Sequence, residues 1–235
     1  MIFMKNLQMA SKYYIQGVFK EELKNRFRCI VNISGEDLIC YIPSSCRLSQ
    51  FLDLQSRDVL LTPLESHAAK TNYAVFAVKY KQSYIVLNTT FPNRIVGYEL
   101  QRKIFNYLGP RKHITREKNV DGYKCDLFVE DSNTIIEIKS VISIEDSPVF
   151  PNVASERVIK QLEKIPGLLA DGYNVLYLFV SLNPYINSVV LNPQKPYGPL
   201  FKKCIDHGMQ VRAYSLGKSN TDFSIKKPID VISVL

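Results

Sequence analysis

The strongest constraint on the fold is a predicted β-hairpin at residues 122–140, which have the sequence GYKCDLFVEDSNTIIEIKS. Two runs rich in β-branched and aromatic residues flank a turn at residues 131–132. A turn there places Asp126 directly opposite Glu137, with Cβ atoms about 5 Å apart. Lys139 shares the face of Glu137, because alternate residues of a strand point the same way. The other face carries apolar residues that we expect in the core: Leu127, Val129, Ile136 and Ile138.

Two opposed carboxylates destabilise a sheet unless a proton or a cation lies between them. Their oxygens suit Mg²⁺ or Mn²⁺, which activates water and polarises a phosphate. We therefore predict a phosphodiester-cleaving site in which Asp126 and Glu137 hold the metal, and Lys139 orients the water or offsets charge on the phosphate. The ordinary alternative is a surface strand with a weak Lys–Glu ion pair, because this pattern is short and common by chance. The sequence leaves both interpretations open.

The N-terminal part of the chain has the pattern of a small all-β unit. Strands are predicted at residues 26–33, 38–42, 59–62, 73–80 and 84–88, with a short helix at 46–52. Close-spaced strands of this kind favour a closed barrel of the OB-fold type, which leaves no exposed strand edge. Aromatic residues alternate with Arg26, Arg28 and other cations, a combination that can hold single-stranded nucleic acid. Packing of those aromatics in the core is the simpler interpretation.

The pattern changes after residue 91, where helices alternate with strands. Helices are predicted at residues 93–108, 152–165 and 199–207, and strands at 124–130, 134–141, 175–182 and 211–215. Asn93 is the expected N-cap of the first helix, which Gly109 and Pro110 end. This order predicts a mixed sheet flanked by helices, so the chain is α/β, with one domain at residues 1–90 and a second at 91–235.

Charge favours a polyanionic partner. The chain carries a formal net charge of +8, and residues 94–124 alone carry +5. A solvated surface is the usual meaning of such a run, but beside two carboxylates that repel DNA we favour phosphate binding. Affinity for DNA should then fall steeply with salt. The candidate nucleic-acid-binding residues are Arg26, Arg28, Arg94, Arg111, Lys112, Arg116, Lys124 and Arg157.

The cysteines and the apolar runs indicate the compartment. No CxxC spacing occurs among the five cysteines, which argues against a zinc site or a disulfide framework. Cys29 and Cys40 would face each other across a hairpin that turns at residues 34–35, and we expect buried thiols there. No apolar run approaches the ~20 residues that span a bilayer. We expect a cytoplasmic protein without a membrane partner; the oligomeric state stays open, with a homodimer as one arrangement.

Several motifs resemble the sugar fermentation stimulation protein A (SfsA) family over nearly the whole chain. They are NRF at 25–27, VLNT at 86–89, NRIV at 93–96, CDLF at 125–128, EIKSV at 137–141, FPNVASERVIKQL at 150–162 and RAY at 212–214. The resemblance implies an N-terminal OB-fold domain, a C-terminal PD-(D/E)xK nuclease-like domain, and DNA binding without strong sequence preference. The positions that match the nuclease motif are Asp126, Glu137 and Lys139.

Two positions depart from the family pattern. The chain has PSSC at residues 43–46 where the family usually has Pro-Asn-Thr-Gly, and Tyr98 stands where an acid is expected on the first helix. Glu99 is the nearest candidate for that acid, although an ordinary ion pair with Lys103 explains it equally well.

A second helix brings two further candidates. Glu156 could be a third metal ligand and Arg157 could contact a phosphate, but the helix dipole alone also favours an acid at this point. The sequence as a whole predicts a DNA-binding protein of low sequence specificity that cleaves phosphodiester bonds with a divalent metal. The alternative is a non-catalytic DNA-binding accessory or transcription-regulatory protein.

Overall fold

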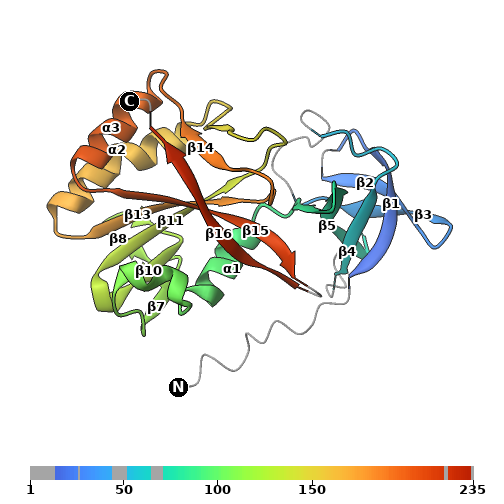
Figure 1. Ribbon diagram of the computed structural model, residues 1–235, viewed down its shortest axis with the longest axis horizontal. Helices are drawn as coiled ribbons and strands as arrows, with labels where there is room; N and C mark the ends of the chain where they lie inside the picture. Colours follow the sequence, from blue (N-terminus) through green and yellow to red (C-terminus); the bar gives the residue numbers. More distant parts are fainter. Residues whose placement is uncertain (1–13, 26, 44–51, 65–70, 220–221, 234–235) are drawn as a thin grey trace.

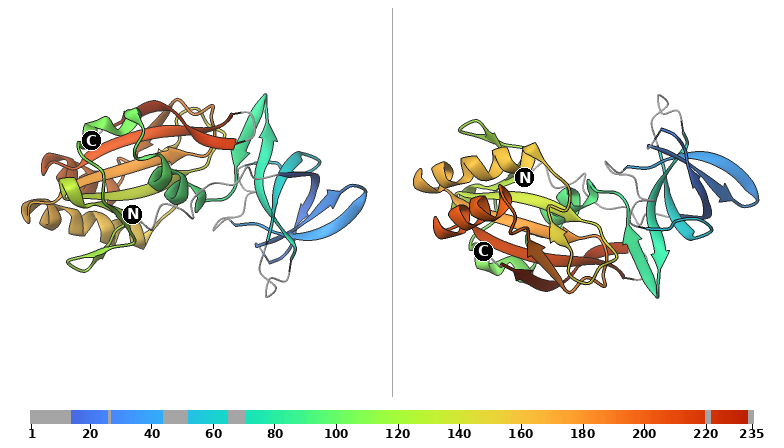
Figure 2. Two further views of the ribbon diagram at one scale, coloured as in Figure 1. Left: turned by 90° about the horizontal axis from the view of Figure 1, so that it is seen from below. Right: turned by 90° about the horizontal axis from the view of Figure 1, so that it is seen from above.

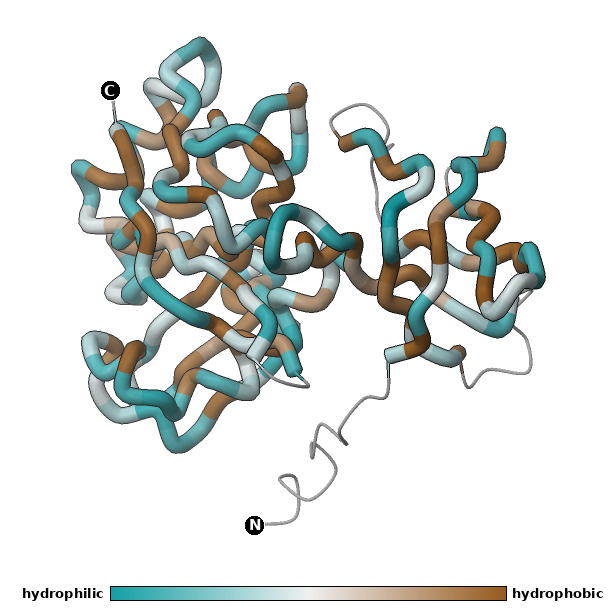
Figure 3. Tube along the Cα trace, turned by 45° about the vertical axis from the view of Figure 1, so that its right-hand side comes forward, coloured by the Kyte–Doolittle hydropathy of each residue, from teal (hydrophilic) through white to brown (hydrophobic). Residues whose placement is uncertain are grey.

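A computed structural model describes residues 14–25, 27–43, 52–64, 71–219 and 222–233. The chain forms a small β-barrel followed by a larger mixed sheet with helices on both faces, and the two lie side by side (Figure 1; Figure 2). Apolar segments of the trace gather in the interior of each part, and polar segments lie mostly in the loops (Figure 3). No helix among the described residues is long and apolar enough to cross a membrane.

The N-terminal sheet closes into the barrel that the sequence predicts. Its strands are β1 (Ile15–Glu22), β2 (Arg28–Ile33), β3 (Glu36–Tyr41), β4 (Asp58–Pro63), β5 (Tyr73–Tyr80) and β6 (Ser83–Val86). They are ordered β3-β2-β1-β4-β5-β6, and pairing between β3 and β5 closes β1 to β5 into a ring. The predicted helix at residues 46–52 lies almost wholly outside the described residues.

The sequence prediction missed β1, the strand that completes the barrel. Its segment, IQGVFKEE, has only three strongly apolar residues and a glycine. The glycine is required by close packing, because a Cβ at Gly17 would lie 2.6 Å from a methyl of Val31 and 2.9 Å from the Asn32 carbonyl. A glycine that lets two strands pack closely has no β-branched or aromatic side chain, so it weakens the strand pattern in the sequence.

The hairpin of β2 and β3 has the predicted register. Cys29 pairs with Cys40 across a turn in which Ser34 and Gly35 both have positive φ. That conformation matches the right-handed twist of the strands. Both cysteines are buried thiols inside the barrel.

The second sheet has eight strands in the order β12-β14-β16-β15-β13-β11-β10-β7. Their bounds are β7 (Ile114–Arg116), β10 (Leu127–Val129), β11 (Thr134–Val141), β12 (Val149–Phe150), β13 (Asn174–Ser181), β14 (Ser188–Leu191), β15 (Gln210–Ser219) and β16 (Asp222–Ile232). A separate ribbon pairs β8 (Asn119–Val120) with β9 (Tyr123–Lys124). Parallel and antiparallel pairs both occur, as predicted for a mixed sheet. The predicted strand at 124–130 is divided between β9 and β10.

The first predicted helix, at residues 93–108, is wrong in its length and its start. Helix α1 (Phe91–Glu99) has Thr90 as N-cap, and a separate 3-10 helix, η2 (Lys103–Leu108), follows it. Side-chain contacts meet at the buried end of α1, where the break occurs. Arg111 Nε donates to the Leu100 carbonyl at 2.7 Å, and Glu99 accepts from Arg102 and from the backbone N–H of Ile225.

Helix α2 (Glu156–Ala170) begins later than predicted and continues through Pro166. A proline inside a helix leaves the carbonyl four residues earlier without its N–H partner. Here the thiol of Cys204, on α3 (Tyr197–Asp206), donates to that carbonyl of Leu162 at 3.1 Å. The thiol therefore compensates for the proline and joins α2 to α3.

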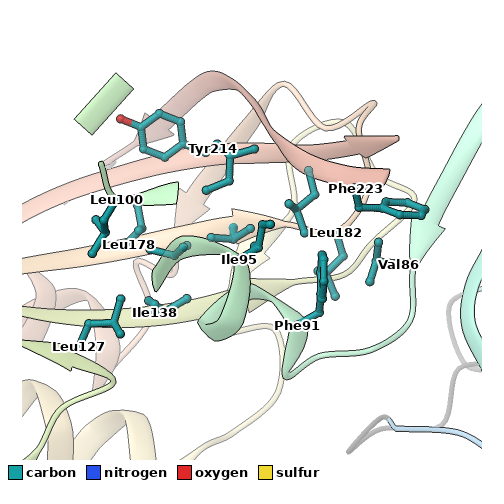
Figure 4. Packing of buried hydrophobic residues seen from close by; sticks show 14 of the residues in the cluster. Val86, Phe91, Ile95, Leu100, Leu127, Ile138, Leu178, Leu182, Tyr214 and Phe223 are labelled. Atoms are coloured by element: carbon teal, nitrogen blue, oxygen red, sulfur yellow. The ribbon is translucent and has the colours of Figure 1, made fainter. Parts of the chain in front are cut away.

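Three apolar clusters hold the structure together, and one of them joins barrel and sheet. The joining cluster contains Phe76 and Val86 from the barrel, Phe91 from α1 and Phe223 from β16. Figure 4 labels Val86, Phe91 and Phe223 among its members. It covers the sheet face that α1 packs on, whereas α2 and α3 cover the other face. The third cluster fills the barrel. Because the joining core runs across residue 90, the division into two domains there stays a prediction.

Candidate active site

The predicted hairpin register is present in the structure. Leu127 pairs with Ile136 and Val129 with Thr134, so the continuation of the same register sets Asp126 against Glu137. The ladder itself stops at Asp126, because its carboxylate Oδ2 accepts the backbone N–H of Ile138 at 2.7 Å. A side chain thus takes the place of a strand carbonyl, and this interrupts the predicted strand. The four apolar residues expected on the opposite face all lie in the joining cluster.

Glu137 is one of the most buried ionisable groups among the described residues, with 1% of its surface exposed. Its Oε1 accepts from Lys139 Nζ at 2.7 Å and from Gln161 Nε2 at 2.6 Å. Its Oε2 accepts from the Tyr123 hydroxyl at 2.9 Å. Burial raises the pKa of Tyr123, so the phenol keeps its proton and remains a donor. Three donors from β9, β11 and α2 therefore hold the carboxylate in one orientation.

Lys139 neutralises Glu137 within the sheet. Only 11% of its side chain is exposed, and its Nζ also donates to Gln161 Oε1 at 2.6 Å. The ammonium lies 5.5 Å from the centre of the Tyr177 ring on β13. An ion pair that is both buried and hydrogen-bonded on each side is costly to break. The weak surface pair that the sequence left open as an alternative does not describe Lys139.

Asp126 lies between α1 and β11, and it is the carboxylate of the site whose pKa is shifted. Asn93 Nδ2 donates to its Oδ1 at 2.8 Å. Burial and the neighbouring Glu137 raise the pKa of Asp126 to about 6, against the lowering effects of the Ile138 N–H, Lys139 and Arg157. A like charge nearby disfavours the ionised carboxylate, and burial disfavours it further. The geometry thus places the two acids as the sequence predicted, on one site.

Asp126→Asn is expected to increase the free energy of unfolding at pH 7 in metal-free buffer, by on the order of 2 kcal/mol. The pKa of Asp126 is raised in the folded state, so its ionisation costs stability. That cost grows as pH rises from 3.8 to about 6 and is constant above it. Urea unfolding of both proteins across this range measures the difference, which should vanish at the acidic end. Glu163→Gln, at an exposed position of α2, is the control, and an Asn variant less stable than wild type at pH 7 contradicts the expectation.

Glu156 does not join the acid pair. Its side chain is 90% exposed and lies 3.9 Å from Lys160, at the first turn of α2. No group of three or more His, Cys, Asp or Glu side chains that could hold a metal occurs in the described part of the chain. Arg157, the next residue, is close enough to lower the pKa of Asp126. The first turn of α2 therefore places Arg157 near Asp126, whereas Glu156 points to solvent.

Two predicted phosphate-binding cations, Arg111 and Lys124, have partners within the protein. Arg111 donates to the carbonyls of Leu100 and Gly109 and to Asn106 Oδ1, so it fixes its own loop. Lys124 pairs with Glu117 at 2.6 Å, although both side chains are exposed. Glu99 pairs with Arg102 and not with Lys103.

Other predicted cations have no ion pair with a described residue. They are Arg28, Arg94, Lys112, Arg116 and Arg157. Arg94 and Arg116 lie together, because Arg116 Nη2 donates to the Arg94 carbonyl at 3.4 Å. Arg26 is outside the described residues. Of the predicted basic residues, the structure therefore brings Arg94 and Arg116 together at α1.

Sequence reasoning missed three residues that shape the site: Asn93 as a partner of Asp126, Tyr123 and Gln161. Gln161 had a signal, since it is polar on the inward face that Val158, Leu162 and Ile165 define. A polar residue on an apolar face needs a buried partner. Asn93 and Tyr123 had no comparable signal.

Comparisons with known proteins give a consistent result. The profile of the sugar fermentation stimulation protein RE domain matches residues 90–222. A sugar fermentation stimulation protein homolog of Desulforamulus reducens is 24% identical over 233 residues, covering 96% of this chain and 95% of its own. One from Caldanaerobacter subterraneus is 25% identical over 224 residues, with 93% and 96% covered. The structure of SfsA from Pyrococcus furiosus in complex with Ca²⁺ superposes with a TM-score of 0.78 at 19% identity, covering 93% of this chain and 95% of that one.

Proposed function

The chain belongs to the sugar fermentation stimulation protein family, and from that premise we propose that it binds DNA and hydrolyses phosphodiester bonds with a divalent cation at Asp126 and Glu137. The observation that carries the proposal is the opposition of these two carboxylates beside a buried lysine. The nuclease class of the fold, the metal and the DNA are all parts of this proposal.

The donor set at the site fits Mg²⁺ or Mn²⁺. Mg²⁺ is held in proteins by one or two carboxylates and completes its shell with water and substrate phosphate. Each oxygen of Asp126 accepts one hydrogen bond and keeps a second lone pair, and so does Oε2 of Glu137. The raised pKa of Asp126 indicates a charge that a cation would balance. The Ca²⁺ bound to the Pyrococcus furiosus relative, a cation that also takes oxygen ligands, supports this choice.

The surrounding side chains have separate tasks. When bound, the cation would polarise the phosphate and lower the pKa of a water. Gln161 and Tyr123 are positioning residues, because they hold Glu137 in place. Lys139 balances the charge of Glu137 and would also offset negative charge on a phosphate bound beside it. Arg157 brings a second cation near Asp126, whose pKa it lowers.

A non-catalytic DNA-binding role is the second candidate. It is favoured by the three hydrogen bonds that Glu137 accepts from Lys139, Gln161 and Tyr123, which hold the carboxylate without a metal. Such a network can serve stability alone. The two candidates agree on DNA and differ on chemistry.

Supercoiled plasmid is expected to be converted to the nicked form in Mn²⁺ or Mg²⁺ and to stay supercoiled in EDTA, because the water and the phosphate need the cation. Agarose gels of a time course measure the conversion, and a gel-shift at low salt measures binding. A shift without nicking in either metal contradicts hydrolysis and supports the second candidate. Absence of both overturns the proposal as a whole.

Mn²⁺ is expected to stabilise the wild-type protein without any DNA present. A cation at 100 times its dissociation constant adds about 2.7 kcal/mol to the free energy of unfolding. Thermal unfolding with and without Mn²⁺ measures this, and Asp126→Asn should lose most of the increase. An equal increase in both proteins would assign the metal to some other site.

A further inference from the structure

A cleft of about 490 Å³ lies where the barrel meets the start of α1. The barrel contributes Phe27 and Tyr41 to its wall. The segment that leads into α1 contributes Thr89, Thr90 and Arg94. Its size is within the range of ligand-binding sites, and its lining mixes aromatic, hydroxyl and cationic side chains. This composition suits a ligand with both flat rings and negative charge.

The aromatic side of the cleft is a stacked pair outside the barrel core. Phe27 and Tyr41 are each 37% exposed, with ring centres 6.4 Å apart and planes inclined by 26°. Cys40 and Ile42, the neighbours of Tyr41, point into the barrel instead. Arg28 is the cross-strand neighbour of Tyr41. Exposed aromatic faces flanked by cations hold unpaired bases, whereas the bases of a duplex are already stacked on each other.

The opposite wall carries positive charge. Arg94 lines this wall, and Arg116, which is outside the lining, donates to the Arg94 carbonyl at 3.4 Å. Neither arginine forms an ion pair with a described residue. Arg116 also packs closely on the helix, because a Cβ at Gly97 would lie 2.7 Å from its Nη2. The Arg116 guanidinium lies against the backbone of Arg94, and guanidinium groups that lack an ion-pair partner are suited to phosphate oxygens.

One short segment connects the cleft to the acid pair. Arg94 lines the cleft, and its neighbour Asn93 donates to Asp126 at 2.8 Å. The carbonyl of Thr89, in the cleft wall, accepts from Ser140 Oγ at 2.7 Å, next in sequence to Lys139. A chain lying in the cleft therefore leads along the first turn of α1 toward the carboxylates.

We propose that this cleft binds unpaired nucleotides, with bases on Phe27 and Tyr41 and phosphates on Arg94 and Arg116, so that the strand delivered to Asp126 and Glu137 is single-stranded DNA. The inference rests on the proposed function and adds the strand state of the substrate to it. Duplex DNA would bind through the cations alone and would gain nothing from the aromatic pair.

The test is fluorescence anisotropy of the full chain with a labelled oligothymidine of about 16 nucleotides and with a duplex of equal length. Wild type should bind the single strand at least about tenfold more tightly, and Phe27→Ala/Tyr41→Ala should lose about tenfold or more for the single strand only. Tyr41→Phe keeps the ring and should bind as wild type. Ile39→Ala is the matched control, on the same strand and the same outer face, 50% exposed and outside the cleft.

Binding is measured in EDTA, so that hydrolysis plays no part, and thermal unfolding checks that each variant is folded. Equal affinity for both DNAs, or unchanged single-strand affinity in the double variant, overturns the inference while DNA binding stands. Binding of neither DNA overturns the proposed function and the inference with it. If Tyr41→Phe lost as much affinity for the single strand as the double variant, the inference would also be overturned, because stacking on the ring would not explain the loss.

Discussion

Glu137→Gln is expected to abolish plasmid nicking and to lower the free energy of unfolding by about 3–5 kcal/mol. The substitution keeps the shape of the side chain and removes its charge. Lys139, with 11% of its side chain exposed, then lies beside an amide and has lost the carboxylate 2.7 Å away. A buried charge without a counter-charge is among the largest single costs that a substitution produces. Loss of a carboxylate that we propose holds the metal should reduce nicking by at least about 100-fold.

A double variant separates the two effects. Glu137→Gln/Lys139→Met removes both charges, and methionine retains most of the apolar stem of lysine. Replacing a buried ion pair by apolar groups of similar size is often neutral or stabilising. We expect the double variant to recover most of the lost stability and none of the nicking. If it nicked as wild type does, the charged pair would have no role in hydrolysis.

Glu130→Gln is the matched control for this series. Glu130 follows β10 in the same hairpin and pairs with Lys118 at 3.3 Å, but its side chain is 46% exposed. An exposed pair contributes at most about 1 kcal/mol, so this variant should unfold and nick as wild type. Urea unfolding in EDTA and nicking at equal concentrations of folded protein are the two measurements.

The acid pair was predictable because a tight turn fixes the register of a hairpin. Once residues 131–132 form the turn, alternation alone decides which side chains face each other. The same local rule placed Cys29 opposite Cys40. Barrel closure was predictable from the number and spacing of short strands. Strand β1 was not predicted, because it carries a glycine, Gly17, where it packs closely against β2.

The sequence could not predict features that depend on partners outside the local pattern, such as the end of α1. Val96, Leu100, Ile104 and Leu108 keep a helical spacing, yet α1 ends at Glu99. There Arg111 donates to the Leu100 carbonyl, and the Glu99 carboxylate accepts from Arg102 and from the N–H of Ile225. The loop partners of Arg111, a predicted phosphate ligand, were hidden for the same reason. A guanidinium bound to carbonyl oxygens of its own loop looks, in a sequence, like any other cation.

Phe76→Ala is expected to lower the free energy of unfolding by about 3–5 kcal/mol and to loosen the contact between barrel and sheet. Phe76 is 2% exposed and points out of the barrel into the joining cluster. Its ring centre lies 5.0 Å from that of Phe91, 5.1 Å from Phe223 and 5.0 Å from Tyr14. Aromatic pairs of this kind add about 0.5–1.5 kcal/mol each beyond the apolar area they bury.

The cavity left by Phe76→Ala would lie beside the first turn of α1, so we expect it to affect the acid pair. Phe91 begins α1, and Asn93 in the same turn holds Asp126, so a cavity at Phe76 should disturb the first turn of α1 before the rest of the sheet. Phe201→Ala is the control: Phe201 is fully buried between α3 and the sheet, in the cluster that does not reach the barrel. Hydrogen exchange should quicken in β5, β6 and α1 for Phe76→Ala and in α3 for Phe201→Ala. Nicking by the folded fraction should fall only in the first. Equal exchange in α1 for both variants would mean that the barrel does not support the acid pair.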